Sequence, residues 1–333
     1  MYVRHEAVLS SQIEGTQSTL EDVLEFEVDE RGEGRPKDIR EVVNYVRAMN
    51  HGLERLRDFP LCLRLIREIH RELLTGVRGS HRAPGEFRKS QNWIGAPGCT
   101  LTEAAFVPPP PHMLMETLGH FENYLHDETL PSLVHCGLAH AQFETIHPFL
   151  DGNGRVGRLL VTLLLCHRGV LSRPLLYLSY YFRARRAEYY DRLTAIRVGG
   201  DWEGWLRFFL RGVSTVSRAA ADTAHAILKL VDGHRARLMA ASRSSTQALS
   251  LLDYLLEQPI VSARMVEGRL GCSHTTAPNL LRALEQEGIL RETTGQKRNR
   301  RYAYTEYIGL FERQTVVGNG SAERPEEAAE EES

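Results

Sequence analysis

Residues His147 to Arg158 read HPFLDGNGRVGR, and the rest of the chain is interpreted outward from this stretch. A helix is expected to end before Pro148, because the residue before a proline avoids the α-helical region. Gly152 and Gly154 allow backbone conformations that other residues avoid. A new helix is expected from about Gly154, so the stretch predicts a glycine-containing loop that leads into a helix N-terminus. Free backbone N–H groups and the helix dipole make such a place a site for anions.

The side chains of the same stretch suit phosphate chemistry. Arg155 and Arg158 lie three residues apart, so both project from the first helical turn, and guanidinium groups fit phosphate oxygens. Asp151 offers the hard oxygen ligands that Mg²⁺ takes at a nucleotide. His147 titrates near neutral pH and can accept a proton from an attacking hydroxyl. Together these groups predict phosphoryl or nucleotidyl transfer. The loop is not a Walker motif, because no Gly-Lys-Ser/Thr follows it.

The stretch resembles the motif of the Fic (Fic/Doc) family, HPFx(D/E)GNGRxxR, at every defined position. The resemblance implies a protein adenylyltransferase that uses ATP and Mg²⁺ to attach AMP to a Ser, Thr or Tyr hydroxyl of a target protein. It implies that His147 deprotonates the hydroxyl, that Asp151 binds Mg²⁺ and that Phe149 packs in the core. Arg158 is implied to hold the γ-phosphate. The residues implied to bind ATP in this stretch are Gly152, Asn153, Gly154, Arg155, Val156, Gly157 and Arg158.

The N-terminal segment carries a second pattern of the family. Ser10 to Gly15, SSQIEG, resembles the inhibitory pattern (S/T)xxxE(G/N), with Ser10, Glu14 and Gly15 at its defined positions. A spacing of one helical turn places Ser10 and Glu14 on one helix face. The resemblance implies that Glu14 pairs with Arg158 and competes with the γ-phosphate for the same guanidinium. Family members with several domains usually have more residues before this helix than this chain has.

Two further segments are assigned by the resemblance. Residues 95–109 correspond to the family's flap, a small β-hairpin that would present an extended target segment beside the nucleotide. Within it, Glu103, Ala104, Ala105 and Phe106 are expected to lie closest to ATP. Tyr189 belongs to a tyrosine pair that resembles one in the family and is the candidate for contacting adenosine. A packing role for Tyr189 is the alternative, since aromatic residues at helical spacing usually belong to a core.

Composition and periodicity predict a mainly α-helical protein. The chain has 333 residues, 42% hydrophobic and 25% charged, with a net charge of -2, as is typical of a globular chain. Five scattered cysteines, no signal segment and no long apolar run predict a cytoplasmic protein without a membrane span. Apolar spacing predicts one helix over residues 5–27. We expect an inhibitory helix and loop at 1–36, the catalytic core at 37–235, a linker at 236–246, a winged helix at 247–313 and a disordered acidic tail at 314–333.

The predicted winged helix-turn-helix domain has helices at 249–257, 262–270 and 274–287, followed by a basic hairpin at 290–304. The third helix would be the recognition helix if the domain binds DNA. Phosphate contacts would come from the hairpin, through Lys297, Arg298, Arg300 and Arg301. Docking of a protein or dimerisation is the alternative use of such a domain.

Three other functions stay open at the level of sequence. The chain can be a DNA-binding regulator whose Fic core only senses a nucleotide. It can be a Fic enzyme that removes AMP or transfers another nucleotide, in which case Glu14 would orient a water molecule. His135, His140 and His147 can be read as ligands of a metallohydrolase, although their spacing does not match the known zinc patterns. Partners of the transferase include the target protein and a second copy of the chain.

Overall fold

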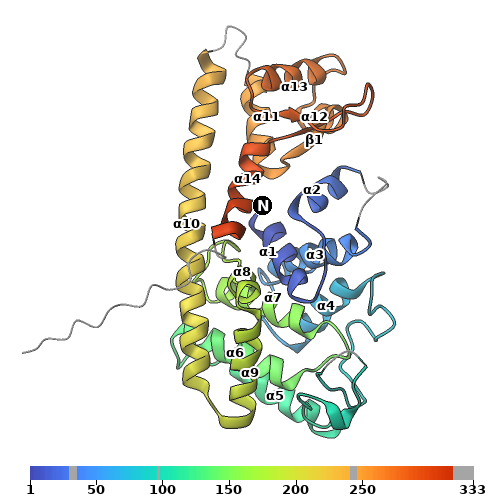
Figure 1. Cartoon of the computed structure of the whole chain (residues 1–333), viewed down its shortest axis with the longest axis vertical. Coiled ribbons are helices and arrows are strands. Elements are labelled where there is room, and N and C mark those ends of the chain that lie inside the picture. Colours follow the sequence, from blue (N-terminus) through green and yellow to red (C-terminus); the bar gives the residue numbers. More distant parts are fainter. Residues whose placement is uncertain (30–35, 96–97, 241–245, 318–333) are drawn as a thin grey trace, which may run out of the picture.

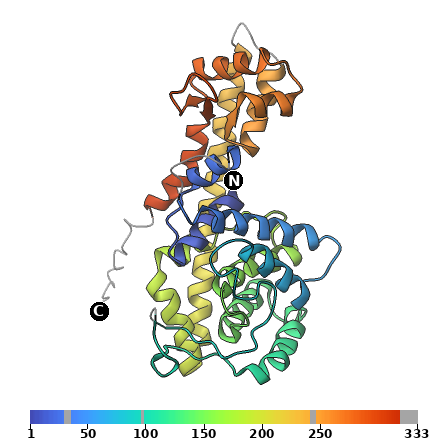
Figure 2. The ribbon, with the colours of Figure 1, turned by 90° about the vertical axis from the view of Figure 1, so that its right-hand side faces the viewer.

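One long helix, α10 (Trp202–Ala240), runs from one end of the molecule to the other. The computed structural model describes residues 1–29, 36–95, 98–240 and 246–317. Figures 1 and 2 show a larger helical body along the lower part of α10 and a smaller body beside its upper end. Most of the described elements are helices, as the sequence predicted. In this part of the chain, no helix has both the length and the apolar composition that a membrane span requires.

The larger body is built around α7. Most residues of α7 are buried, as expected for a helix that is surrounded by other elements on all sides. Helices α3, α4 and α6 pack against it, and the loop between α6 and α7 holds the stretch from His147 to Gly152. The helices of this body are Tyr2–Ile13 (α1), Leu20–Val28 (α2), Ile39–Arg55 (α3), Leu63–Leu74 (α4), Leu114–Leu125 (α5), Ser132–Ile146 (α6), Asn153–His167 (α7), Ser179–Ala184 (α8) and Arg186–Gly199 (α9).

The N-terminal segment forms two helices where the sequence predicted one over residues 5–27. The chain turns after α1 because Gly15 adopts a φ of 94°, a left-handed conformation that glycine tolerates. Thr19 then starts α2 with a capping box, in which its hydroxyl accepts from the Asp22 amide and the Asp22 carboxylate accepts from the Thr19 amide. Glu14 therefore lies at the end of α1, beside the turn, and not inside a continuous helix.

The flap is less regular than the predicted hairpin. Ile94 and Phe106 exchange two backbone hydrogen bonds, of 2.8 and 3.1 Å, and form a single bridge. Between them, Leu101–Glu103 forms a 3₁₀ turn (η1), and a second 3₁₀ turn, Pro111–Met113 (η2), leads into α5. The run of prolines from 108 to 111 lacks backbone donors, which limits further pairing. Residues 96–97 of the predicted flap lie outside the described residues.

The smaller body is the predicted winged helix-turn-helix domain. It contains α11 (Thr246–Glu257), α12 (Ala263–Leu270) and α13 (Thr276–Gln286). Its three-stranded antiparallel sheet has the order β1-β3-β2, formed by Ile260–Ser262 (β1), Arg291–Glu292 (β2) and Arg301–Ala303 (β3). Residues 293–300, between β2 and β3, are called the wing below. The sequence did not predict α8 or the last helix.

That last helix, α14 (Thr305–Val317), returns from the winged helix along α10 towards the larger body. Its Phe311 is 1% exposed and packs edge-on against Tyr2 of α1, with ring centroids 5.1 Å apart. α14 begins inside the predicted winged helix and ends inside the predicted tail, and α10 continues into the predicted linker. Residues 241–245 of that linker and 318–333 of that tail lie outside the described residues.

Candidate active site

The loop between α6 and α7 is fixed by side chains from three directions. Asn153 is buried, and its amide group bonds the backbone N–H and C=O of Phe149 at 2.8 Å each. Phe149 is buried and stacks on His70 of α4, with 3.7 Å between ring centroids. Asn92, before the flap, donates to the Phe149 carbonyl at 2.9 Å. The Asn153 side chain is thus bonded within the loop, so only the backbone N–H of Asn153 is left to donate to a phosphate.

His70 is a residue of this site that the sequence did not single out. Its Nδ1 accepts from the Gly85 amide at 2.8 Å, so its Nε2 carries the proton and donates to the Asp151 carbonyl at 3.0 Å. Burial lowers the pKa of His70 to about 4, which keeps this tautomer neutral. A histidine four residues before Leu74 on an apolar helix face gave no local sign of this role.

Glu14 and Arg158 meet at the N-terminus of α7. Glu14 Oε1 lies 2.6 Å from Arg158 Nη2, and the Arg158 side chain is almost fully buried. Ser10 accepts from Arg158 Nε through its hydroxyl at 2.8 Å and from Nη2 through its carbonyl at 3.1 Å. Burial opposes the charge of Glu14, but Arg158 outweighs it, so the pKa of Glu14 lies below its ordinary value.

The Glu14 carboxylate rests against the backbone of the first turn of α7. A methyl group on Gly154 would lie only 2.5 Å from Glu14 Oε1, so the carboxylate approaches the backbone here as closely as a glycine allows. The carboxylate thus lies against the positive end of the α7 dipole and beside the Arg158 guanidinium. These are the surroundings that a phosphate group would seek at the same place.

Arg155 has a different environment from Arg158. It is buried and pairs with Glu41 of α3, at 3.1 Å between Nη1 and Oε2. Its Nη2 lies 3.9 Å from Asp151 Oδ1, and the side chain of Asp151 is 38% exposed. Glu41 is a second site residue that sequence reasoning missed, because nothing in its local pattern separates it from other helical glutamates. Val156 is 1% exposed and faces the core, and Gly157 is also buried.

The exposed carboxylate of Asp151 can hold Mg²⁺ only together with other ligands. No group of three or more His, Cys, Asp or Glu side chains that could hold a metal occurs among the residues that the structure describes. Mg²⁺ in nucleotide sites is commonly held by one or two carboxylates, substrate phosphates and water. A single accessible Asp beside an anion-binding helix N-terminus fits that arrangement.

His147 ends α6 in a left-handed conformation, with a φ of 49°. Its backbone N–H donates to Phe143 at 2.9 Å, and its carbonyl accepts from Arg88 Nε at 3.0 Å. Burial, with help from Arg197, lowers the pKa of His147 to about 4. The imidazole is therefore neutral at pH 7 and able to accept a proton.

Tyr189, the predicted adenosine contact, is used inside the protein. It is 1% exposed, and its hydroxyl donates to His140 Nε2 at 2.9 Å while His140 Nδ1 donates to the Gly157 carbonyl at 3.0 Å. The environment of Tyr189 is therefore that of a packing residue, which was the alternative to an adenosine contact. Tyr190 is 36% exposed and lies under the Arg186 guanidinium, so it is the member of the pair that reaches the surface. Glu144, not predicted, is buried nearby, and burial raises its pKa to about 7.

The predicted flap residues differ in what they face. Glu103 is exposed and caps the 3₁₀ turn by accepting from the Thr100 amide and hydroxyl, at 2.9 and 2.8 Å. Ala104 is half-buried and Ala105 is exposed. The Phe106 ring lies 4.1 Å from the Arg197 guanidinium carbon, and Arg197 also donates to the Glu144 carbonyl. Among the four predicted residues, Phe106 thus contacts Arg197, which in turn bonds α6 three residues before His147.

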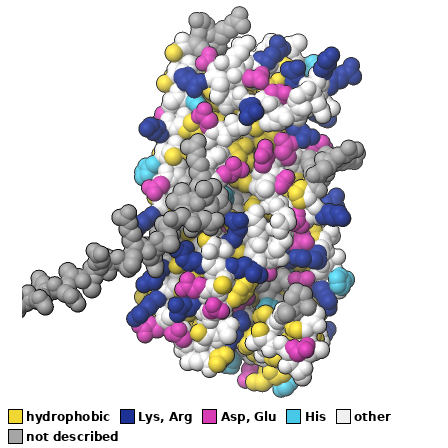
Figure 3. Space-filling view, viewed as in Figure 1, with side chains coloured by type: hydrophobic (Ala, Val, Ile, Leu, Met, Phe, Trp, Pro, Cys, Tyr) yellow, Lys and Arg dark blue, Asp and Glu magenta, His cyan; other side chains and the backbone are white. Residues whose placement is uncertain are grey.

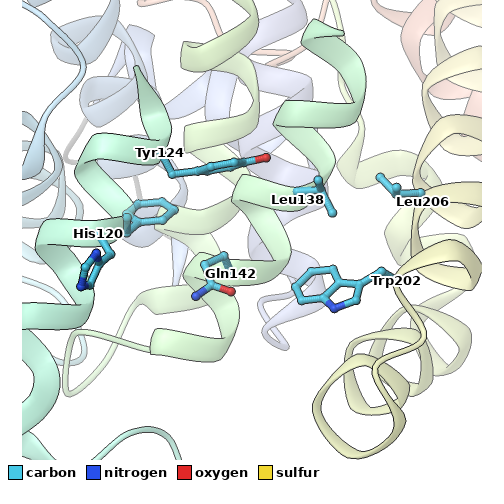
Figure 4. Close-up of a pocket in the computed structure, with 7 residues that line it drawn as sticks. His120, Tyr124, Leu138, Gln142, Trp202 and Leu206 are labelled. Atoms are coloured by element: carbon cyan, nitrogen blue, oxygen red, sulfur yellow. The ribbon is translucent and has the colours of Figure 1, made fainter. Parts of the chain in front are cut away.

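The three histidines of the metallohydrolase interpretation have separate partners. His135 Nε2 bonds the Tyr124 carbonyl at 2.6 Å, and both nitrogens of His140 are used by Tyr189 and Gly157. A separate, largely apolar cavity of about 540 Å³ lies where α5, α6 and α10 meet, and no residue of the stretch 147–158 lines it. Figure 4 shows the Trp202 ring and the Gln142 amide at this cavity. The separate hydrogen-bond partners of His135 and His140 disfavour a metal centre built from the three histidines.

The basic residues of the winged helix line a second cleft, of about 1110 Å³, which we call the wing cleft. Its basic lining residues are Arg264, Arg282, Lys297, Arg298, Arg300 and Arg301. Lys297, Arg298 and Arg300 are exposed. Arg301 instead pairs with Glu25 of α2 and with Asp29, the latter at 2.8 Å.

Comparison with known proteins gives matches to three family models. Residues 60–165 match the Fic/DOC family, residues 1–54 match the Fic/DOC family N-terminal model, and residues 249–303 match an HTH DNA binding domain. The chain is similar to the protein adenylyltransferase Fic of Aedes aegypti, with 32% identity over 177 residues, and to that of Drosophila virilis, with 31% over 170 residues. These matches cover 52% and 50% of this chain but only 31% and 30% of the relatives.

Solved structures share the fold. A Fic family protein from Desulfovibrio desulfuricans G20 has a TM-score of 0.59 at 23% identity, with 97% of this chain and 88% of that chain covered. A Fic domain containing signaling protein from Bacteroides thetaiotaomicron VPI-5482 has a TM-score of 0.52 at 19% identity, with 66% of this chain and 87% of that one covered. The first likeness extends over nearly the whole chain, including the smaller body.

Proposed function

We propose that this chain, whose residues 1–54 and 60–165 belong to the Fic/DOC family, transfers AMP from ATP to a Ser, Thr or Tyr hydroxyl of a target protein. The observation that carries the proposal is the placement of the Glu14 carboxylate, which lies against Gly154 and 2.6 Å from Arg158. An internal carboxylate in that position marks the start of α7 as an anion site. ATP would bring its phosphates to the backbone N–H groups at the start of α7 and to the same guanidinium.

His147 is proposed as the base. The imidazole is neutral at pH 7. The hydrogen bonds of the His147 backbone with Arg88 and with the Phe143 carbonyl fix the position of its Cα, from which the side chain projects. It would take the proton of the target hydroxyl as the oxygen attacks the α-phosphate and pyrophosphate leaves. Mg²⁺ held by Asp151 and the phosphates would neutralise charge on the leaving group. Asn153 and Gly154 would contribute backbone N–H groups to the same phosphates. Gly152 would join them once its N–H leaves Asp151 Oδ1, to which it donates at 2.6 Å.

Glu14 is proposed to inhibit the transfer. Its carboxylate occupies Arg158, so a γ-phosphate must displace it before ATP can take a productive position. Removing Glu14 leaves Arg158 without its acidic partner and open to phosphate. Glu14 and the γ-phosphate of the nucleotide thus compete for the same Arg158 guanidinium.

The test is label transfer from ATP labelled on its α-phosphate, with the chain itself and a cell lysate as acceptors. We expect Glu14→Gly to raise labelling roughly tenfold or more, the effect of about 1.4 kcal/mol less competition. Glu14→Gln, which keeps the size and removes the charge, should raise it in the same direction. In the Glu14→Gly background, His147→Ala should lower labelling roughly 10²-fold or more. Full activity of His147→Ala would reject the mechanism, and no labelling by any variant that still binds ATP would reject AMP transfer from ATP.

A second function, DNA binding, is supported by the wing cleft. Six arginine and lysine side chains line it, and they come from α12, α13 and the wing region, the parts of a winged helix that would meet a duplex. Five of the six are exposed, all but Arg301, and exposed cations in that number suit a phosphate backbone. Filter binding or anisotropy with duplex DNA tests it, and affinity should fall steeply as salt is raised because bound counterions are released.

A further inference from the structure

The turn that carries Glu14 is linked to the winged helix through α2. Residues 15–19 separate Glu14 from the start of α2, and Gln17 and Ser18 in this turn bond the Asp38 carboxylate at 2.5 and 2.6 Å. At the far end of α2, Glu25 and Asp29 accept from the two terminal nitrogens of Arg301. α2 also packs on β1 of the winged helix. α2 therefore contacts the winged helix at one end and continues at the other into the Glu14 turn, which Asp38 also holds.

A second connection joins the winged helix to α1 itself. Arg4 pairs with Glu27 of α2 at 2.8 Å, and its Nη1 donates to the Glu257 carbonyl at the end of α11, at 3.1 Å. One arginine thus touches α1, α2 and the winged helix. Together with the Arg301 cluster, it makes the two N-terminal helices and the smaller body one connected unit.

Arg301 also belongs to the wing cleft, and its two roles exclude each other. The cleft is lined by the end of α2, with Val28 and Asp29, on one side and by α12, α13 and the wing on the other. Figure 3 shows several Lys and Arg side chains at the upper, winged-helix end of the molecule, with Asp and Glu side chains among them. Asp29 lies in this basic cleft where a phosphate would otherwise approach Arg301. A polyanion that enters the cleft meets these carboxylates as competitors for the same guanidinium.

We propose that duplex DNA bound in the wing cleft draws Arg301 away from Glu25 and Asp29, loosens α2 and the Glu14 turn, and thereby raises AMP transfer. The inference rests on the proposed function for its catalytic readout. Duplex DNA is favoured over an acidic peptide because the cations extend over α12, α13 and the wing, as a groove and its two backbones require. Linkage requires the converse as well: if bound DNA disfavours the inhibited form, the inhibited form must bind DNA more weakly than the active form does.

The central experiment compares wild type, Glu25→Gln/Asp29→Asn and a matched control, Glu21→Gln. Glu21 is an exposed residue at the other end of α2, so its substitution removes a charge from the same helix without touching Arg301. Anisotropy with a short fluorescein-labelled random-sequence duplex measures affinity. We expect the double variant to bind roughly fivefold more tightly than wild type, as loss of a competing ion pair allows, and the control to stay near wild type.

The transfer assay uses the same three proteins with and without the duplex. DNA should stimulate wild type and the control, whereas the double variant should start high and gain little. Hydrogen exchange gives a readout that needs no activity: the duplex should speed exchange in α1 and in residues 15–19 of wild type. Equal DNA affinity of all three proteins, or unchanged exchange with DNA bound, would overturn the inference.

A Glu14→Gly variant separates the two proposals. If that variant labels protein while DNA leaves wild-type labelling unchanged, the coupling is wrong and the transferase stands. If Glu14→Gly labels nothing, AMP transfer is wrong, and the exchange and affinity measurements alone decide the coupling. Failure of wild type to bind the duplex, with binding of an acidic peptide instead, would also overturn the choice of DNA.

Discussion

His147 is held by its backbone in a conformation that few residues other than glycine adopt. A φ of 49° places a bulky side chain in the left-handed region, and such positions persist only when the surroundings determine them. Here Arg88 contributes bonds to His147, Ile146 and Pro109, so one buried guanidinium ties the loop to the flap. These bonds fix the backbone of His147, the proposed base, at the end of α6.

The pH dependence of transfer follows from the environment of His147. Its pKa is lowered to about 4 by burial, so the neutral, proton-accepting form persists as pH falls and is lost only when pH passes through about 4. We expect single-turnover labelling by Glu14→Gly to change little between about pH 8 and about pH 5.5, where an ordinary histidine with a pKa near 6.5 would already have lost activity. A midpoint near pH 6.5 would show that His147 is solvated in the working enzyme.

Tyr189 gives a prediction about stability. Tyr189→Phe leaves the buried His140 Nε2 without its donor, which should lower the free energy of unfolding by about 1–3 kcal/mol. Tyr190→Phe, at the partly exposed neighbour, should change it by less than about 0.5 kcal/mol. Urea unfolding of both variants measures this. Unchanged stability of Tyr189→Phe together with weaker ATP binding would return Tyr189 to the role of an adenosine contact.

Among the elements, α6 and α10 approach each other closely through Gly137. A methyl group there would lie 2.9 Å from the Phe209 ring, and the Gly137 carbonyl accepts from Trp205 Nε1 at 2.8 Å. α10 buries Trp205 and Phe209 at this contact, and the Trp205 ring stacks on His140 of α6 with 5.7 Å between centroids, so neither helix can retreat without opening the core. Since α6 ends at His147, the contact helps to set the position of the site.

Gly137→Ala should therefore lower the free energy of unfolding by about 1–3 kcal/mol, the usual effect of overpacking. Gly119→Ala is the matched control, because Gly119 lies within α5 and a methyl group there meets nothing within 4 Å. The control should be neutral or more stable by up to about 1 kcal/mol, since alanine favours a helix. Denaturant unfolding compares the two. Equal stabilities would mean that α6 and α10 move apart easily.

At the scale of the whole molecule, α10 and α14 join the winged helix to the larger body. α10 runs through both, and α14 carries Phe311 back onto α1. The His234 ring of α10 also bonds the Tyr304 hydroxyl, at 2.8 Å, at the start of α14. Two bodies that share a continuous helix and a returning helix should unfold together.

Phe311→Ala tests that expectation. Its ring is buried between Tyr2 and Tyr307, so truncation should cost about 3–5 kcal/mol. We expect one calorimetric transition at a lower temperature and faster hydrogen exchange in α1 as well as in α14. Two separate transitions, with only the winged helix affected, would show that the two bodies unfold independently.

The sequence predicted the helical fold and the order of the winged helix because apolar spacing and glycine positions act locally. It predicted one N-terminal helix where the structure has two, although Gly15 and the Thr19–Asp22 capping pair carried the signal for a break. α14 was missed because its amphipathic stretch follows a hairpin and was absorbed into the domain end and tail. Glu41 and His70 were missed because each acts on a loop far away in sequence.

By itself, the sequence determined which consecutive residues stand together and predicted their chemistry: a base, an acidic metal ligand and an anion-binding helix start within HPFLDGNGRVGR. Only the tertiary structure decided which distant side chains share those groups. Arg155 pairs with Glu41, the Tyr189 hydroxyl points inward to His140, and Arg301 pairs with Glu25 of α2. The physical reason is that loop chemistry depends on local backbone geometry, whereas ion pairs and burial depend on how helices distant in sequence pack together.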